Sequence, residues 1–307
     1  MNPNDRIFPP MSGDGTSKPV YAMTSPIIAE SREREFEFTD RDFAYLREIV
    51  TGHSGIMLGE QKRQLVYGRL TRRLRQLRLD SFEQYCAYVE QHLDEELGEL
   101  INAITTNLTS FFRENHHFEH LADSALPETM AHNASARRLR IWSAGCSTGE
   151  EPYSIAMTVS ETLGSSLSGW DARILATDID SQVVARAQAG VYQQDRIEGL
   201  SPARQRRWFS LGTGPNSGKV RVSGDLQELL AFRQLNLLKD WPMRGPFDII
   251  FCRNVVIYCD KDTQKTLFDR YADLLVPNGY LYVGHSESLH RISDRFKLIG
   301  KTIYQRI

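Results

Sequence analysis

The 307-residue sequence has few cysteines, no long apolar run and almost no net charge. Its cysteines, Cys86, Cys146, Cys252 and Cys259, form no CxxC pair, which argues against a zinc ribbon or redox motif and favours free thiols in a reducing compartment. No apolar stretch approaches the ~20 residues of a membrane span, and the amino-terminus lacks the apolar core of a signal peptide. A formal net charge of −2 provides no overall attraction to nucleic acid. We therefore expect a cytoplasmic protein without nucleic-acid binding or membrane insertion.

Composition and periodicity divide the chain into three regions. Residues 1–33 are rich in Pro, Gly, Ser and Asn without a period, which we interpret as a disordered extension. Residues 34–113 have a helical pattern throughout, starting with a capped helix after Thr39. Residues 114–307 alternate strands and helices, as in a doubly wound, mostly parallel α/β sheet. Within this region, residues 211–235 combine a Gly-rich turn with β-like alternation and predict a small β insertion. We expect strands at 138–143, 172–177, 247–252 and 279–284, and a closing hairpin at 296–307.

A loop of small residues follows the first expected strand. Residues 143–151, Ser-Ala-Gly-Cys-Ser-Thr-Gly-Glu-Glu, let the backbone turn sharply and approach a ligand before the next helix. Because the loop is not GxGxxG, ligand binding and plain packing remain nearly balanced on this feature alone. Glu150 and Glu151 suit a helix amino-terminus electrostatically, but they would repel a pyrophosphate. They favour a ligand that carries positive charge and no phosphate, such as S-adenosylmethionine (SAM).

Polar residues also end two later strands. Asp178 ends the second expected strand and could accept both hydroxyls of a ribose, whereas Asp180 suits the cap of the next helix. Asn254 follows the strand at 247–252, where strand ends line the cleft of an open sheet. Asn236 and Leu237 lie where an adenine edge could bind, although that pair alone would be unremarkable.

Five segments together resemble the CheR family, the chemotaxis receptor glutamate methyltransferases. They span from about residue 36 to the carboxyl end and occur in the family's order. The segments are TNLTSFFRE at 106–114, WSAGCSTGEEPYSIA at 142–156, TDID at 177–180, GPFDIIFCRNVVIY at 245–258 and GHSE at 284–287.

The resemblance implies a class I SAM-dependent methyltransferase domain behind an all-α domain, with S-adenosylhomocysteine (SAH) as the product. Two residues are implied to hold the substrate carboxylate. Arg113 has a planar guanidinium group that suits a carboxylate, and Tyr258 can donate a hydrogen bond. The implied cofactor contacts are Asn107, Thr109, Arg113, Glu151, Asp178, Asn236, Leu237, Arg253 and Asn254. The alternative role of Arg113 is an ion pair that links the two domains, and the alternative role of Tyr258 is a packed aromatic side chain. No metal is expected, although His116 and His120 have the i, i+4 spacing of a zinc pair.

Two surfaces are expected to bind partners. The helix at 60–79 carries Lys62, Arg69, Arg72 and Arg73 beside its buried face. A basic run alone fits a solvated face or a nucleic-acid patch equally well; in the family context it resembles a docking surface for the acidic cytoplasmic helices of chemoreceptors. The β insertion is similar to one that holds a receptor carboxyl-terminal peptide in some family members, and otherwise it is a structural flap. Its basic residues are Lys219, Arg221 and Arg233.

Two other functions compete with receptor methylation. A methyltransferase for RNA or a small molecule predicts a broader basic surface and the Asn/Asp-Pro-Pro-aromatic motif of amino-group methylation, where this chain has Asn254-Val-Val-Ile. A SAM-binding regulatory module predicts damaged motifs, yet Arg113, Asp178, Asn254 and Tyr258 are all present.

Overall fold

The computed structural model describes residues 35–307. The predicted extension at 1–33 lies outside the described residues. Residues Phe36–Ile307 form one compact unit, which holds a helical bundle and a large sheet. No helix between residues 35 and 307 combines the length and the apolar character that crossing a bilayer requires.

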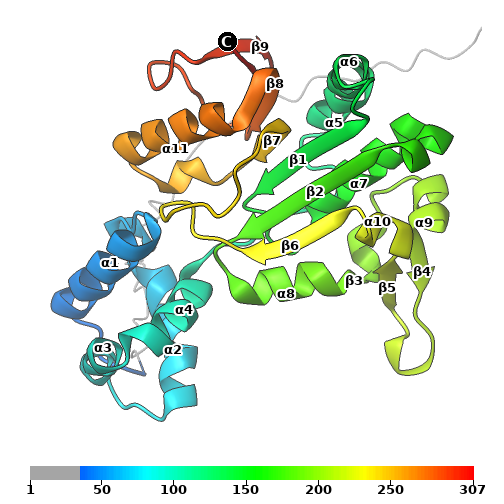
Figure 1. Ribbon diagram of the computed structural model, residues 1–307. Coiled ribbons are helices and arrows are strands. Elements are labelled where there is room, and N and C mark those ends of the chain that lie inside the picture. Colours follow the sequence, from blue (N-terminus) through cyan, green and yellow to red (C-terminus); the bar gives the residue numbers. More distant parts are fainter. Residues whose placement is uncertain (1–34) are drawn as a thin grey trace, which may run out of the picture. The chain divides into compact units, whose positions relative to one another are not determined.

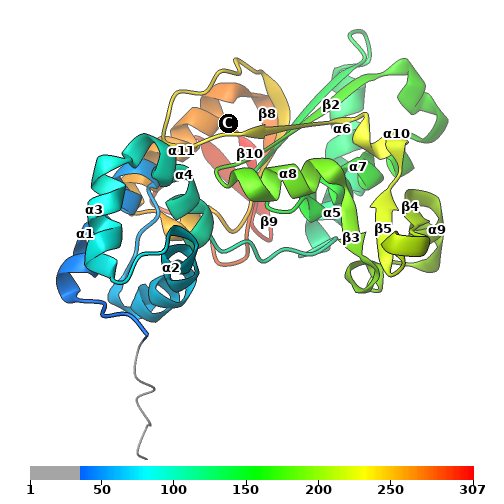
Figure 2. The ribbon, with the colours of Figure 1, turned by 90° about the horizontal axis from the view of Figure 1, so that it is seen from below.

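Four helices at the start of the described chain pack around an apolar core (Figure 2). Thr39 and Asp42 form a capping box at the first helix, as predicted, and Gly55 ends that helix in a left-handed conformation. Val66, Leu70 and Leu74 recur every four residues on the second helix and are fully buried, as the periodicity predicted. The elements are α1 (Asp40–Ser54), η1 (Glu60–Lys62), α2 (Arg63–Leu77), α3 (Phe82–Gln91) and α4 (Leu93–Ile104).

The remainder of the chain builds a seven-stranded sheet in the order β6-β2-β1-β7-β8-β10-β9 (Figure 1). Neighbouring strands from β6 to β8 are parallel, and the antiparallel hairpin of β9 and β10 closes one edge, as predicted. The sequence-based prediction of a doubly wound sheet is therefore confirmed. The strands are β1 (Arg138–Ala144), β2 (Asp171–Asp178), β6 (Leu230–Gln234), β7 (Phe247–Cys252), β8 (Leu275–Val283), β9 (Phe296–Gly300) and β10 (Ile303–Arg306).

Helices cover both faces of this sheet because alternate residues of each strand point to opposite sides. On β7, Ile249 and Phe251 pack with the helices before and after β1, whereas Ile250 and Cys252 pack with the helix before β8. The first layer contains α5 (His116–His120), η2 (Leu121–Ala125), α6 (Leu126–His132), α7 (Glu150–Leu163) and α8 (Ser181–Ala189). The second contains α11 (Lys261–Leu274).

A separate three-stranded antiparallel sheet has the order β3-β5-β4. Its position corrects the predicted β insertion at 211–235. The small sheet begins at Val191 and ends at Val222, and residues 230–234 instead form β6 beside β2 in the main sheet. Arg233 therefore lies outside the small sheet. The elements of this region are β3 (Val191–Gln193), η4 (Gln194–Ile197), α9 (Pro202–Trp208), β4 (Phe209–Leu211), η5 (Gly214–Asn216), β5 (Lys219–Val222) and α10 (Gly224–Gln227). Two short helices lie elsewhere, η3 (Gly164–Gly169) and η6 (Val256–Tyr258).

Candidate active site

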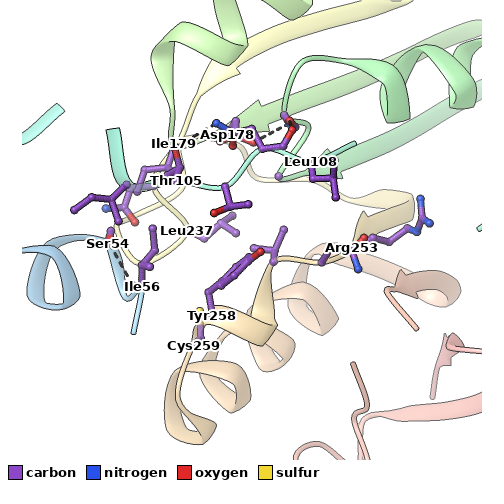
Figure 3. Close-up of a pocket in the computed structure, with 18 of the residues that line it drawn as sticks. Ser54, Ile56, Thr105, Leu108, Asp178, Ile179, Leu237, Arg253, Tyr258 and Cys259 are labelled. Atoms are coloured by element: carbon purple, nitrogen blue, oxygen red, sulfur yellow. Dashed lines mark hydrogen bonds between the residues drawn. The ribbon is translucent and has the colours of Figure 1, made fainter. Parts of the chain in front are cut away.

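A pocket lies at the carboxyl ends of β1, β2, β6 and β7, where the sheet order reverses direction (Figure 3). The helical bundle and its connection to the sheet supply the other wall, through residues such as Ile56, Leu58 and the segment 104–109. The loop after β1 turns sharply because Gly145 has φ +91°, and a Cβ there would lie 2.2 Å from Val255 Cγ2. The predicted loop of small residues therefore forms part of a real cavity.

All the predicted cofactor and catalytic residues line this one pocket. Three of them, Asn107, Thr109 and Arg113, come before β1 in the chain, so the fold brings them to the strand ends. The residues are Asn107, Thr109, Arg113, Glu151, Asp178, Asn236, Leu237, Arg253, Asn254 and Tyr258. Glu150, the neighbour of Glu151, points elsewhere, because it pairs with Arg196 and accepts a hydrogen bond from Thr148. Their shared location is observed, while the contact of each residue with a cofactor stays a prediction.

Asp178 ends β2 as a buried carboxylate that faces the pocket. It accepts hydrogen bonds from the backbone N–H groups of Ser147 at 2.8 Å and Asp180 at 3.1 Å. Burial raises the pKa of Asp178 to about 6, although these two N–H groups oppose the rise. A carboxylate has about four lone-pair sites, so acceptor capacity remains for a ligand's hydroxyl groups. Asp180 instead caps α8 through Gln182 and Val183, as predicted.

Glu151 and Arg253 form a buried ion pair at one end of the pocket. Arg253 Nη1 lies 3.0 Å from Glu151 Oε2, and Ser143 Oγ donates to Oε1 at 2.8 Å. Burial raises the pKa of Glu151, while Arg253 and Ser143 favour its ionised form. Arg253 also donates to the backbone carbonyl of Arg113, which ties the strand end to the segment that carries that arginine.

Arg113 and Tyr258 approach the pocket from different segments. Arg113 is half-buried and its Nη1 donates to Leu108 O at 2.8 Å. Tyr258 lies on η6 and directs its ring into the pocket (Figure 3). The ammonium of Lys62 lies 4.8 Å from the centre of that ring.

Glu287 supports the site from behind the pocket lining, although the sequence suggested no role for it. Its buried carboxylate accepts hydrogen bonds from the backbone N–H groups of Gly284, Asn254, Val255 and Ile257. These bonds hold the turn between β7 and η6, including the left-handed backbone of Asn254 at φ +59°. The only signal in the sequence was the GHSE segment, because the contact joins residues about thirty positions apart. Glu287 therefore fixes the start of the segment that presents Tyr258.

The predicted basic face of α2 is partly occupied within the protein. Arg73 forms an ion pair with Glu96, with Nε to Oε1 at 2.9 Å, and Glu96 is only 1% exposed. Arg69 donates to the carbonyls of Ile104 and Thr105 at the end of α4. Arg69 and Arg73 therefore join α2 to α4, while the docking role of the four basic residues stays a prediction.

The predicted spacing of His116 and His120 does not produce a joint site. His120 Nδ1 lies 2.9 Å from the Tyr282 hydroxyl, whereas His116 Nε2 lies 3.2 Å from the carbonyl of Lys301. Ligating atoms of Glu114, His116 and His117 do lie within 4.8 Å of one another. However, Glu114 already has a cationic partner, because Arg253 Nη2 is 3.3 Å from its Oε2. A bound cation would compete with that guanidinium, so we assign no metal here.

The polar groups of the pocket fit SAM. Glu151 and Asp178 are anionic groups suited to an ammonium and to ribose hydroxyls, and Arg113 is a cation suited to a carboxylate. Apolar side chains, including Ile104 and Leu237, provide a surface for a flat ring. This mixture of charges matches a ligand with an amino-acid end, a ribose and a base.

Comparison with known proteins agrees with the geometry. Residues 41–105 match the family described as "CheR methyltransferase, all-alpha domain", and residues 107–305 match "CheR methyltransferase, SAM binding domain". The chain is similar to "Chemotaxis protein methyltransferase 2" of Pseudomonas aeruginosa, at 50% identity over 286 residues, which covers 91% of this chain and 97% of that protein. It is also similar to "Chemotaxis protein methyltransferase" of Escherichia coli, at 44% identity over 281 residues, covering 91% and 94%. Both domains and nearly the whole length are matched, so this chain belongs to the CheR family of SAM-dependent methyltransferases.

Proposed function

We propose that this enzyme transfers a methyl group from SAM to glutamate side-chain carboxylates of chemoreceptors, forming glutamyl methyl esters. The main observation in support is that Arg113 and Tyr258 line the same pocket as Asp178 and Glu151. A carboxylate-binding pair therefore adjoins groups suited to the cofactor. The relatives named as chemotaxis protein methyltransferases favour a receptor as the acceptor.

The chemistry needs alignment more than acid or base. A glutamate with an unperturbed pKa of about 4.3 is already ionised at neutral pH. SAM, when bound, supplies a methyl group activated by a sulfonium. Arg113 and Tyr258 hold the attacking carboxylate in line, which converts an encounter in solution into an oriented reaction.

Each cofactor residue has a proposed role from its chemistry. Asp178 accepts from the ribose hydroxyls, and Glu151 with Arg253 binds the amino-acid end. Asn236 and Leu237 contact the adenine, with the Asn236 amide held by the carbonyl of His53 at 2.6 Å. The other predicted contacts are Asn107, Thr109, Arg113 and Asn254.

The proposed partner is the cytoplasmic helical domain of a chemoreceptor. Of the four predicted docking residues, Arg72 is exposed on α2, and Lys62 lies beside Tyr258. The positive charge of both could attract acidic side chains around the acceptor glutamate, and such attraction weakens with salt. Arg69 and Arg73 contribute by holding α2 in place.

The small sheet is a proposed site for a receptor carboxyl-terminal peptide. Among residues 35–307, its outer strands, β3 and β4, each have one edge that pairs with no other strand. An extended peptide could pair with such an edge, and exposed Arg221 on β5 could attract an acidic residue or a terminal carboxylate. A tether of this kind would raise the local concentration of enzyme near receptor helices.

The test is incubation of the purified protein with labelled SAM and membranes that contain chemoreceptors. We expect methyl label on the receptor that mild base removes, because carboxyl esters hydrolyse. Label resistant to base would indicate an amine or another acceptor. Binding of SAH without any transfer to several receptor preparations would favour the regulatory module. Arg113→Ala is the control for transfer that depends on this pocket.

A further inference from the structure

Exposed apolar side chains gather at the mouth of the pocket. Among the described residues nine large hydrophobic side chains are exposed, and two of them, Leu65 and Leu108, line this pocket. Two more adjoin it, because Ile257 precedes the lining residue Tyr258 and the Met57 N–H donates to the Tyr258 carbonyl. Their exposed fractions are 45% for Met57, 37% for Leu65, 77% for Leu108 and 43% for Ile257. We call these four side chains the apolar rim. They come from four separate segments, so their gathering is a property of the fold.

The apolar rim adjoins both proposed catalytic residues. Leu108 accepts the hydrogen bond of Arg113 through its carbonyl, and its side chain lines the pocket across from Tyr258 (Figure 3). On the other side, the N–H of Met57 donates to the carbonyl of Tyr258 at 2.8 Å, and Ile257 is the preceding residue. A carboxylate held between Arg113 and Tyr258 would therefore have apolar surface on both sides.

Cationic side chains occur beside the rim. Leu65 lines the pocket, and so does Lys62, three residues earlier. Arg72 follows Leu65 by seven residues, about two helical turns, so all three side chains lie near one side of α2. The ammonium of Lys62 contacts the Tyr258 ring and the carbonyl of Met57. A partner that fits this surface must therefore present apolar and acidic side chains close together.

We propose that the apolar rim binds an amphipathic helix of the methyl acceptor, with apolar side chains one turn to either side of the glutamate to be methylated. This inference rests on the proposed function and specifies how its acceptor is recognised. On a helix, residues three or four apart lie about 5–6 Å apart, so one glutamate and its flanking residues contact the pocket and rim together. Acidic residues farther along the helix meet Arg72. Selection among glutamates then depends on apolar neighbours as well as on charge.

Docking on the rim would also dry the pocket. Methyl transfer from a cation to an anion neutralises charge, so removing water favours the reaction. The exposed rim side chains lose contact with water when the helix covers them, which contributes affinity at the same time.

The test compares two double variants that remove similar apolar surface. Met57→Ser/Ile257→Ser alters rim positions that do not line the pocket, whereas Leu298→Ser/Ile299→Ser alters exposed side chains on β9. We expect the rim variant to raise KM for receptor membranes about tenfold, because the bound helix would cover the exposed parts of both side chains. At saturating receptor its kcat should fall by less than its KM rises, because the helix still covers the pocket once it is bound. The β9 variant should leave both constants unchanged.

Two further measurements separate the possible failures. SAH titration and thermal unfolding should be normal for both double variants, which excludes a folding defect. The inference would be overturned if KM in the rim variant were unchanged, or if kcat fell without a rise in KM. In either case, receptor methylation by the unaltered protein would still support the proposed function. Absence of receptor methylation by the unaltered protein would instead reject the proposed function.

Discussion

The pH dependence of cofactor binding tests the role of Asp178 directly. Its carboxylate is buried, and burial raises its pKa to about 6 in the ligand-free protein. Ribose hydroxyls that donate to Asp178 would stabilise the ionised form and lower this pKa on binding. A group with a lower pKa in the complex must lose its proton for binding, so SAH affinity should fall as the pH falls below about 6.

The size of the effect follows from the two pKa values. If binding returns the pKa of Asp178 to about 3.9, the ordinary value for aspartate, SAH should bind about tenfold more weakly at pH 5 than at pH 7. Most of the loss should occur below pH 6, with little change between pH 7 and pH 8. Binding near pH 5 should release close to one proton.

Calorimetry of SAH binding at pH 5, 6 and 7 measures both quantities, with two buffers of different ionisation enthalpy to count the released protons. Asp178→Asn is the matched control, because an amide oxygen still accepts from the backbone but has no proton to lose. Its affinity should be weaker at pH 7 and should depend much less on pH, because, among the proposed cofactor contacts, only the buried carboxyl of Glu151 then remains to titrate. An unaltered protein with the same affinity at pH 5 and pH 7, or a control with the same pH slope, would refute the assignment of Asp178.

Three other predictions follow from the site and its surroundings. Tyr258→Phe removes only a hydroxyl, and loss of one hydrogen bond to the carboxylate should lower kcat about tenfold with SAH affinity unchanged; full turnover would make Tyr258 a packing residue. Arg73→Ala leaves buried Glu96 without its cation, so the free energy of unfolding measured in urea should fall by about 3 kcal/mol. Arg72→Ala should change that free energy by less than about 0.5 kcal/mol and raise KM for receptor. Equal stability of the two variants would contradict the buried pair. Arg221→Glu should abolish binding of receptor carboxyl-terminal peptides and preserve SAH binding, and if no peptide from receptors of the same organism binds the unaltered protein, the small sheet has no tethering role.

Local patterns determined much of this protein without tertiary information. Alternation and apolar content located the strand at 247–252, and the capping pattern at Thr39 located the first helix. Asp180 was predicted to cap α8 because its position just before a helix is a local property. Most of the pocket residues were predicted because they lie in segments whose sequence resembles the CheR family, and strand ends meet at one edge of a parallel sheet. Asn236 and Leu237 lie outside those segments and were predicted from the family pattern and their place in the chain.

Only the tertiary structure decided which segments pair across long distances. Residues 219–222 and 230–234 both alternate like strands, but the first pairs with β3 and β4 and the second with β2, and nothing local distinguishes them. Arg73 has the same local setting as Arg72, yet a buried carboxylate 23 residues away removes it from the free surface. Glu287 and the apolar rim likewise depend on contacts between distant segments. Helices and strands follow from interactions between near neighbours, whereas these features require that the chain first bring remote residues together.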